Sequence, residues 1–397
     1  MINLEDVCEF IVDCPHSTAK DEGEGFPLIR TPNIGKGRLL LDGVHRVSED
    51  VYNKRNARAV PQDDDLIFAR EAPAGNVAIV KNGEKVCLGQ RTVLLRPNKE
   101  LVNPDFLTYF LLAPEQQYGL LGTANGATVS HVNIPTIRGL KINLPPLQVQ
   151  SRIAEIISSY DDLIENNQKQ TKLLEEAAQR LYKEWFVDLR FPGHETTPIV
   201  DGIPEGWSMC TAGNVIEFNP KTPLKKGCIK QSVPMTALST SSMVLNSSEF
   251  TMTESNSGAK FRNGDTLLAR ITPCLENGKT AFVAGITSEE GAVGSTEFIV
   301  MRAKKINPYM VYLLARTEEF RKTAINSMTG SDGRQRAQVD KIMQFPYLLA
   351  PQSTLEAFSQ LVEPIFEQVY LKNSQIAQLS QARDRLIPKL MNREIEV

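Results

Sequence analysis

Two long stripes of mainly apolar residues constrain the fold of this chain more than any other feature. In each stripe the steps alternate between four and three residues without a break, which is the spacing of a coiled-coil seam. The first stripe covers residues 153–185 and the second covers residues 358–390. A single stripe would equally suit an amphipathic helix packed on its own domain, whereas two stripes of matching length and register predict two helices packed on each other.

The two predicted helices would form a seam of apolar residues with one polar position in each stripe. A helix over the first stripe would extend roughly 50 Å at ~1.5 Å per residue, which is longer than a small globule needs for its own core. Asn167 and Lys372 fall at the same place in the two stripes and would fix the register at some cost in stability. The expected seam comprises Ile157, Ile164, Asn167, Leu174, Leu181, Val362, Val369, Lys372, Leu379 and Leu386.

The segments that precede the stripes are weakly duplicated as well. Asp-Leu-Ile-Phe-Ala-Arg at residues 65–70 recurs as Asp-Thr-Leu-Leu-Ala-Arg at residues 265–270, and a proline follows each copy. Leu-Leu-Ala at residues 111–113 recurs at residues 313–315. The chain therefore consists of two similar units, each a globule followed by a long helix.

Short apolar runs between Gly, Asn and Asp clusters predict strands at residues 66–69, 77–80 and 93–95. Residues 104–113 and 308–315 predict short helices, each with a proline in its first turn. We expect an α+β protein with two similar globular domains separated by two long antiparallel helices that form a coiled coil, with a pseudo-twofold internal repeat. The expected ranges are 1–146 for the first globular domain, 147–191 for the central helical region, 200–351 for the second globular domain and 352–397 for the C-terminal helical region.

Composition and local sequence exclude several classes of protein. No apolar run approaches the roughly 18–20 residues that span a bilayer, and no signal peptide is visible, so neither a membrane protein nor a secreted one is expected. The six cysteines occur singly, which indicates reduced thiols and a cytoplasmic protein. The net charge of −3 argues against a protein that coats nucleic acid without sequence preference.

The candidate catalytic motifs each lack a necessary part. Gly278-Lys279-Thr280 resembles the end of a phosphate-binding loop, but Pro273 occupies the position of its first glycine. The three aspartates at residues 63–65 suit a solvated turn before a strand better than a metal site. Cys14 and His16 are too close in sequence to face each other readily. We therefore predict no catalytic centre, no metal ion and no cofactor in this chain.

Local clusters of basic and amide residues are the candidates for contact with nucleic acid. Cations in loops neutralise phosphates, and Arg, Asn and Gln discriminate base edges. A solvated loop is an equal alternative for any one cluster, and Arg70 and Arg270, which the duplication retains, would also suit bonds to loop carbonyls at a strand end. The candidates are Arg30, Asn33, Lys36, Arg38, Arg70, Arg91, Lys225, Lys226 and Arg270, with Lys221 and Lys260 nearby in the second unit.

Several segments resemble the specificity subunit of type I restriction–modification systems over the whole chain. Leu-Tyr-Lys-Glu-Trp-Phe-Val-Asp-Leu-Arg-Phe-Pro-Gly-His-Glu at residues 181–195 is similar to the end of that family's central helix, and Ile-Pro-Glu-Gly-Trp at 203–207 is similar to the opening of its second recognition domain. Leu-Pro-Pro-Leu-Gln-Val-Gln at 144–150 is similar to its entry into the helix, whereas Leu-Ala-Pro at 349–351 lacks the usual double proline. Residues 270–279 and 294–298 look like one recurrent type of recognition domain, which adds Thr272, Asn277 and Lys279 to the candidates for DNA binding.

The resemblance implies a non-catalytic subunit whose two target recognition domains each read one half of a bipartite DNA site, with the helices measuring the spacer. Its implied partners are double-stranded DNA, two methyltransferase (modification) subunits and restriction endonuclease/translocase subunits. S-adenosylmethionine would be bound by the methyltransferase partner, and ATP and Mg by the endonuclease partner.

Two alternatives remain open at the level of the sequence. A non-catalytic coiled-coil adaptor could bridge two protein partners through the duplicated globules without reading DNA sequence. An enzyme with an unrecognised site is the second alternative, but no constellation of residues favours it.

Overall fold

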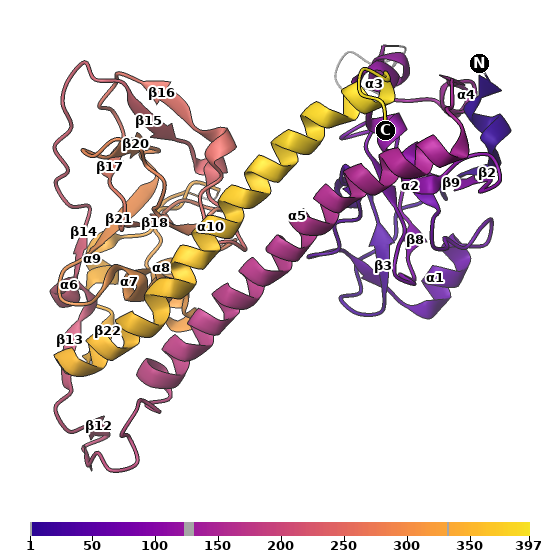
Figure 1. Ribbon diagram of the computed structural model, residues 1–397. Helices are drawn as coiled ribbons and strands as arrows, with labels where there is room; N and C mark the ends of the chain where they lie inside the picture. The colour runs from indigo at the N-terminus through magenta and orange to yellow at the C-terminus, as the bar shows by residue number, and fades with distance from the viewer. Residues whose placement is uncertain (1, 123–130, 332) are drawn as a thin grey trace. The chain divides into compact units, whose positions relative to one another are not determined.

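The computed structural model describes residues 2–122, 131–331 and 333–397 (Figure 1). Contacts within the chain divide it into two compact units. Unit 1 comprises Met1–Glu165 and Ile376–Val397, and unit 2 comprises Asn166–Gln375. Each unit thus contains a globular part together with one portion of each long helix. The four domain ranges expected from the sequence stay a prediction.

Unit 1 is built on a five-stranded sheet. The strands of unit 1 are β1 (Ile2–Asn3), β2 (Cys8–Asp13), β3 (Phe26–Ile29), β4 (Gly37–Arg38), β5 (Arg46–Val47), β6 (Leu66–Ala69), β7 (Val77–Ile79), β8 (Cys87–Leu88), β9 (Thr92–Pro97) and β10 (Lys141–Ile142). The main sheet has the order β2-β9-β6-β7-β4, and only β4 and β7 pair in parallel. A three-stranded sheet, β5-β3-β8, and the pair β1-β10 accompany it.

The α-helices of the globular part of unit 1 include α1 (Glu49–Arg55), α2 (Pro104–Leu112), α3 (Pro114–Leu121) and α4 (Ile134–Arg138). The start of α2 is specified by two neighbouring residues. Asn103 accepts a hydrogen bond of 3.0 Å from the backbone N–H of Phe106, and Pro104 supplies a fixed φ at the first helical position. The predicted helix over residues 104–113 is thereby confirmed.

Unit 2 contains two four-stranded sheets. Its strands are β11 (Ile199–Val200), β12 (Ile203–Pro204), β13 (Ser208–Thr211), β14 (Ile216–Phe218), β15 (Lys230–Val233), β16 (Thr251–Thr253), β17 (Ala259–Phe261), β18 (Thr266–Ala269), β19 (Thr280–Phe282), β20 (Ala292–Gly294), β21 (Phe298–Ala303) and β22 (Pro346–Leu349). The sheet orders are β14-β21-β18-β19 and β16-β15-β20-β17, beside the pairs β13-β22 and β11-β12.

The α-helices of the globular part of unit 2 include α6 (Ala212–Val215), α7 (Pro308–Arg316), α8 (Glu318–Asn326) and α9 (Val339–Met343). The N-terminus of α7 repeats the design of α2. Asn307 accepts a hydrogen bond of 2.8 Å from the N–H of Met310, and Pro308 follows it. Residues 308–315 are helical as predicted.

The duplication extends to the order of the strands. β2-β9-β6-β7 in unit 1 corresponds to β14-β21-β18-β19 in unit 2, and every neighbouring pair in both series is antiparallel. The predicted strand at residues 66–69 is β6, and its counterpart at residues 266–269 is β18. All residues of both strands are buried, as expected for the centre of a sheet covered on both faces.

A buried ion pair is duplicated together with these strands. In unit 1 the guanidinium of Arg96 donates two hydrogen bonds, of 2.8 and 2.7 Å, to Asp65, and in unit 2 Arg302 donates two, both of 2.7 Å, to Asp265. The aspartate side chains are only 2% and 1% exposed. The expectation of a solvated turn is therefore wrong for Asp65, because that aspartate locks the start of β6 to β9 through a bidentate pair.

We predict that Asp265→Asn lowers the free energy of unfolding by about 2 kcal/mol or more, because it leaves the guanidinium of Arg302 without its counter-ion in a largely buried position. The measurement is the guanidinium chloride midpoint of the full chain. Glu318→Gln, in the exposed pair between Glu318 and Lys322, is the control and should leave the midpoint unchanged. Equal shifts for the two variants would contradict the assignment.

The two long helices are α5 (Leu147–Tyr182), which continues into a π-helical turn at Lys183–Val187, and α10 (Gln352–Met391) (Figure 1). α5 begins directly after the prolines at residues 145 and 146, as the sequence predicted. Among the described residues no helix is both long enough and apolar enough to cross a membrane.

Each unit contains an antiparallel contact between segments of α5 and α10. In unit 1, Ile387 and Leu390 of α10 share a core with Ile153 and Ile157 of α5. In unit 2, the ring of Phe358, near the start of α10, lies 5.6 Å from the ring of Trp185, just beyond the end of α5. Early residues of one helix thus meet late residues of the other in both units, which confirms the antiparallel pair of long helices.

The apolar face of the long helices is wider than the predicted seam. Phe366, which lies outside the 4-3 stripe, is buried against Phe282 and Tyr312 of unit 2. Both expected roles of the stripe therefore apply, because one helix face must cover the other helix and the neighbouring globule. Of the expected seam residues, Ile157, Ile164, Val362 and Val369 are buried, and Asn167, Leu174, Leu181, Lys372, Leu379 and Leu386 are partly buried. The register role of Asn167 and Lys372 stays a prediction.

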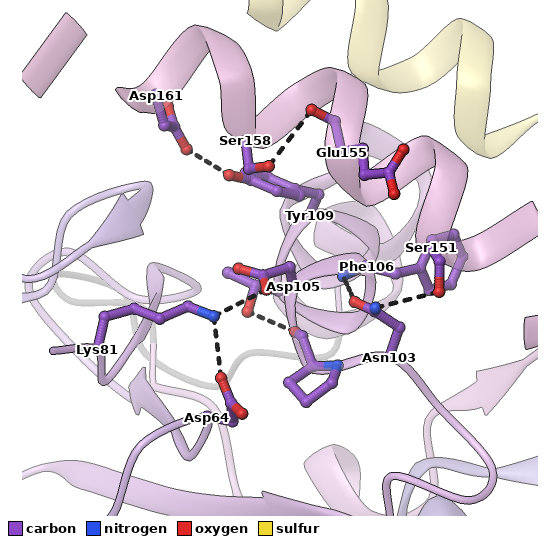
Figure 2. A network of polar contacts seen from close by, with 12 residues as sticks. Asp64, Lys81, Asn103, Asp105, Phe106, Tyr109, Ser151, Glu155, Ser158 and Asp161 are labelled. Atoms are coloured by element: carbon purple, nitrogen blue, oxygen red, sulfur yellow. Dashed lines mark hydrogen bonds and ion pairs between the residues drawn. The ribbon is translucent and has the colours of Figure 1, made fainter. Parts of the chain in front are cut away.

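A polar network ties α2 to both long helices within unit 1, and Figure 2 shows its contact with α5. The Tyr109 hydroxyl donates a hydrogen bond of 2.6 Å to Oδ2 of Asp161 on α5, and Arg383 of α10 forms an ion pair with Oδ1 of the same carboxylate. Burial, reinforced by the negative charge of Asp161, raises the pKa of Tyr109, so this hydroxyl stays protonated and donates. Because Asp161 is 3% exposed, its two partners supply the charge and the hydrogen bond that water would otherwise give.

The same network continues below α2 through Lys81, whose ammonium group lies 2.8 Å from Asp105 and 2.9 Å from Asp64 (Figure 2). Burial opposes the positive charge, but the hydrogen bonds to these two carboxylates outweigh it and raise the pKa of Lys81. Asp105 is a residue of α2 itself, so the helix is held at its N-terminal turn as well as at Tyr109.

We expect Tyr109→Phe to destabilise the chain by about 2 kcal/mol, because it removes a hydrogen bond to a buried carboxylate while keeping the ring. The change is to be read from chemical unfolding followed by circular dichroism. Tyr118→Phe is the matched control, because Tyr118 is 82% exposed. A loss of stability for Tyr118→Phe as large as that for Tyr109→Phe would refute the role of the network.

Candidate nucleic-acid interface

The turn at residues 30–38 in unit 1 carries four of the candidates, and two of them shape the turn itself. The side-chain oxygen of Asn33 accepts a hydrogen bond of 3.2 Å from the N–H of Arg30, and its amide donates to the carbonyl of Leu40. Asn33 is 7% exposed. Lys36 is exposed, and in the described part of the chain its side chain has no hydrogen-bond or ion-pair partner.

Arg38 is directed toward α5. Its guanidinium donates a hydrogen bond of 3.0 Å to Asp162 and lies 3.9 Å from Asp105. Burial opposes the positive charge, but the electrostatic influence of Tyr109, the hydrogen bond to Asp162 and the nearby Asp161 carboxylate raise the pKa of Arg38. Its contacts are internal to unit 1, and its role as a DNA ligand stays a prediction.

Arg70 and Arg91 belong to one polar cluster of unit 1. Arg70 donates a hydrogen bond of 3.0 Å to the carbonyl of Val132 and one of 3.1 Å to Asp13, and it contacts Nε2 of His131 at 2.8 Å. Its side chain is 11% exposed. Arg91 lies 2.9 Å from Glu71, whose carboxylate also contacts His131. Arg70 therefore has the structural contacts that the sequence left open as an alternative to DNA binding.

The lysines of the loop before β15 differ from these arginines because they lie on the surface. Lys225 is 76% exposed at its side chain and forms an ion pair of 2.6 Å with Glu290. That carboxylate raises the pKa of Lys225 and so keeps the lysine charged. Lys226 is also exposed, and no partner for its side chain is present among residues 2–122, 131–331 and 333–397.

Four candidates follow β18 in unit 2. The Arg270 guanidinium donates a hydrogen bond of 3.3 Å to the carbonyl of Ala337, and Lys279 donates one of 3.0 Å to the carbonyl of Met235. The Thr272 hydroxyl is buried without a partner among the described atoms. Asn277 is exposed. Lys279 therefore helps hold its own loop, while Asn277 remains accessible.

The structure brings further residues to the neighbourhood of Arg270. Lys221, Lys260 and Thr296 line the same groove as Arg270. Three separate segments supply these residues, so no local motif could have joined them. Membership of two basic loops was the only signal for the lysines, and the only signal for Thr296 was its place in the segment at residues 294–298.

Cys14 and His16, which the sequence offered as a nucleophile and a base, differ in their exposure. Cys14 is fully buried, whereas the His16 side chain is 70% exposed and lies 3.0 Å from Asp13. Within the part of the chain that the structure describes, no group of His, Cys, Asp and Glu residues has the arrangement of a metal site.

Comparison with known proteins points to one family. The sequence model of the type I restriction modification DNA specificity domain matches residues 1–176. The MjaIX type I restriction enzyme specificity subunit of Methanocaldococcus jannaschii is 26% identical over 364 residues, which cover 89% of this chain and 83% of that protein. The putative MjaX specificity subunit of the same organism is 30% identical over 217 residues, which cover 53% of this chain and about half, 51%, of that protein.

A solved structure shares the fold. The type I restriction-modification system S subunit from M. genitalium superposes with a TM-score of 0.54 at 14% identity, covering 96% of this chain and 93% of that one. The shared fold agrees with the match to the specificity domain model and with the similarity in sequence to the MjaIX specificity subunit. This chain is thus similar in sequence, over most of its length, to specificity subunits of type I restriction enzymes.

Proposed function

We propose that this chain selects the DNA target of a type I restriction–modification complex by reading a bipartite site, one half with the globular part of each unit. The observation that carries the proposal is the duplicated sheet with unlike side chains around it. β2-β9-β6-β7 and β14-β21-β18-β19 share their order, yet the side chains around them differ. The N–H of Arg70 donates to the Arg91 carbonyl in unit 1, whereas the N–H of Arg270 donates to the Glu297 carbonyl in unit 2, so Glu297 stands where unit 1 has Arg91. A repeated scaffold with different polar residues suits two readers of different sequences.

The chemistry of the complex belongs to other subunits. The proposed partners are two methyltransferase subunits, which bind S-adenosylmethionine and modify adenine, and endonuclease/translocase subunits that use ATP and Mg. The proposed location is the cytoplasm, where the host DNA lies. With a net charge of −3, this chain would leave many of the phosphate contacts to its partners.

The two long helices would set the distance between the half-sites. A helix such as α5 extends roughly 50 Å at ~1.5 Å per residue. That length corresponds to about one and a half turns of duplex at ~34 Å per turn, so two readers could reach separate segments of the major groove. The antiparallel contacts in each unit support this role, because a change of length in one helix must be matched in the other.

The first test maps methylated adenines in host DNA by long-read sequencing, in cells with and without the gene for this chain. We expect one bipartite motif to lose its methylation when the chain is absent and to regain it when the chain is restored. An unchanged methylation pattern, with no sequence-dependent protection by the purified complex, would favour the adaptor that bridges two proteins without reading DNA.

The second test changes the helices. Inserting seven residues after Asn167 and seven after Lys372 keeps the 4-3 spacing and should lengthen the spacer between the half-sites without changing the half-sites themselves. The readout is the methylated motif. The same insertion at the exposed turn of Asn82 and Gly83 is the control, and it should leave both spacer and half-sites unchanged. An unaltered spacer in the helix variant would disprove the measuring role.

A further inference from the structure

A groove of about 780 Å³ opens on the globular part of unit 2. It runs past the end of β14, where Pro220 and Lys221 lie, and past the end of β18, where Arg270 lies. Three of its lining residues are cations, Lys221, Lys260 and Arg270, and within the described part of the chain no aspartate or glutamate lines it. A concave surface with this charge favours an anion.

The buried part of the Arg270 side chain is not fully satisfied by hydrogen bonds within the described residues. Its Nε is buried and has no hydrogen-bond partner in the described residues, and the bond of 3.3 Å to the Ala337 carbonyl is long. The nearby Glu297 is already engaged, because Arg336 binds both oxygens of that carboxylate at 2.7 to 3.0 Å. These hydrogen bonds are the main cause that lowers the pKa of Glu297, and the charge of Arg270 adds a smaller effect. A buried guanidinium N–H without an acceptor is costly, so a bound acceptor would stabilise this site.

Arg70, the counterpart of Arg270 in unit 1, has a hydrogen-bond partner for its Nε and an ion-pair partner, both of which Arg270 lacks in the described residues. The backbone surroundings are the same, since Val132 N–H donates to the Arg70 carbonyl at 3.0 Å and Ala337 N–H donates to the Arg270 carbonyl at 2.8 Å. The side chains differ. Arg70 has a carboxylate, Asp13, at 3.1 Å, whereas no ion pair neutralises Arg270 in the described part of the chain.

The strand register explains this difference. Asp13 of β2 stands opposite Val93 of β9. In unit 2, Phe218 of β14 stands opposite Met301 of β21, so continuing that register by two residues places Pro220 where unit 1 has Asp13. The residue that neutralises the arginine in unit 1 is thus replaced by one without charge, and Pro220 lines the groove.

We propose that this groove binds a phosphate of the DNA backbone, with the Arg270 guanidinium as its principal ligand and Lys221 and Lys260 beside it. The inference rests on the proposed function and adds an asymmetry to it. In unit 2 Arg270 binds the DNA backbone, whereas in unit 1 its counterpart Arg70 binds residues of its own unit. A guanidinium matches the oxygens of a phosphate through paired hydrogen bonds, and lysines add charge without demanding a fixed geometry.

The test uses the full chain in complex with its methyltransferase partner and measures affinity for the mapped duplex and for an unrelated duplex at several salt concentrations. The double variant Lys221→Ala with Lys260→Ala should bind both duplexes more weakly and should reduce the slope of log K against log salt by about 2, since each phosphate contact contributes about 0.9. Arg270→Gln should weaken binding to both duplexes by about tenfold.

Lys304→Ala is the matched control, because Lys304 is an exposed lysine of unit 2 outside the groove, and it should leave slope and affinity unchanged. If the double lysine variant has the same slope of log K against log salt as Lys304→Ala, the proposal is overturned. This comparison holds even if Arg270→Gln fails to fold. An altered base preference with unchanged binding to unrelated DNA would overturn the phosphate assignment and make the groove a base reader. A wild-type complex without preference for any duplex would instead refute the proposed function, and the salt slopes would still decide the groove.

Discussion

The apolar face of α5 and α10 is the constraint on which both units depend. In unit 1 the late residues of α10 enter the same core as the first turns of α5, and in unit 2 Phe358 packs among Tyr182, Trp185 and Phe186 at the other end. A segment of each helix is thus part of the core of each unit. Because apolar burial is the main favourable term in folding, neither globular part has its complete core without both helices.

Polar groups on α5 give this apolar packing a defined orientation. Asp161 accepts the Tyr109 hydroxyl and pairs with Arg383 in unit 1. In unit 2, Glu175 accepts hydrogen bonds from the Met243 N–H at 3.0 Å and the Ser242 hydroxyl at 3.1 Å, although burial raises its pKa. Apolar contacts alone tolerate rotation and sliding, whereas a buried acid is satisfied only in one arrangement, so these acids specify how α5 lies on each unit.

The charged candidates show where sequence reasoning about a binding surface reaches its limit. In the sequence Arg38, Arg70 and Arg91 resemble Lys36 and Lys226, yet in the described part of the chain the arginines have carboxylate partners and the two lysines have none. The acids that engage these arginines come from other parts of the chain, such as Asp13 for Arg70 and Asp162 for Arg38. Charge is a property of a residue, but its availability to DNA depends on distant neighbours.

The sequence by itself determined the duplication, the two long amphipathic helices, the short helices that begin at Pro104 and Pro308, and the buried strands at residues 66–69 and 266–269. These features follow from periodicity and capping, which act between residues close in the chain. Only the tertiary structure decided that Asp65 is buried in an ion pair and that Arg270 faces a groove with Lys221 and Lys260 while Arg70 is neutralised. The physical reason is that ion pairs and grooves are formed by residues brought together from distant segments, and their strength depends on burial that no local pattern encodes.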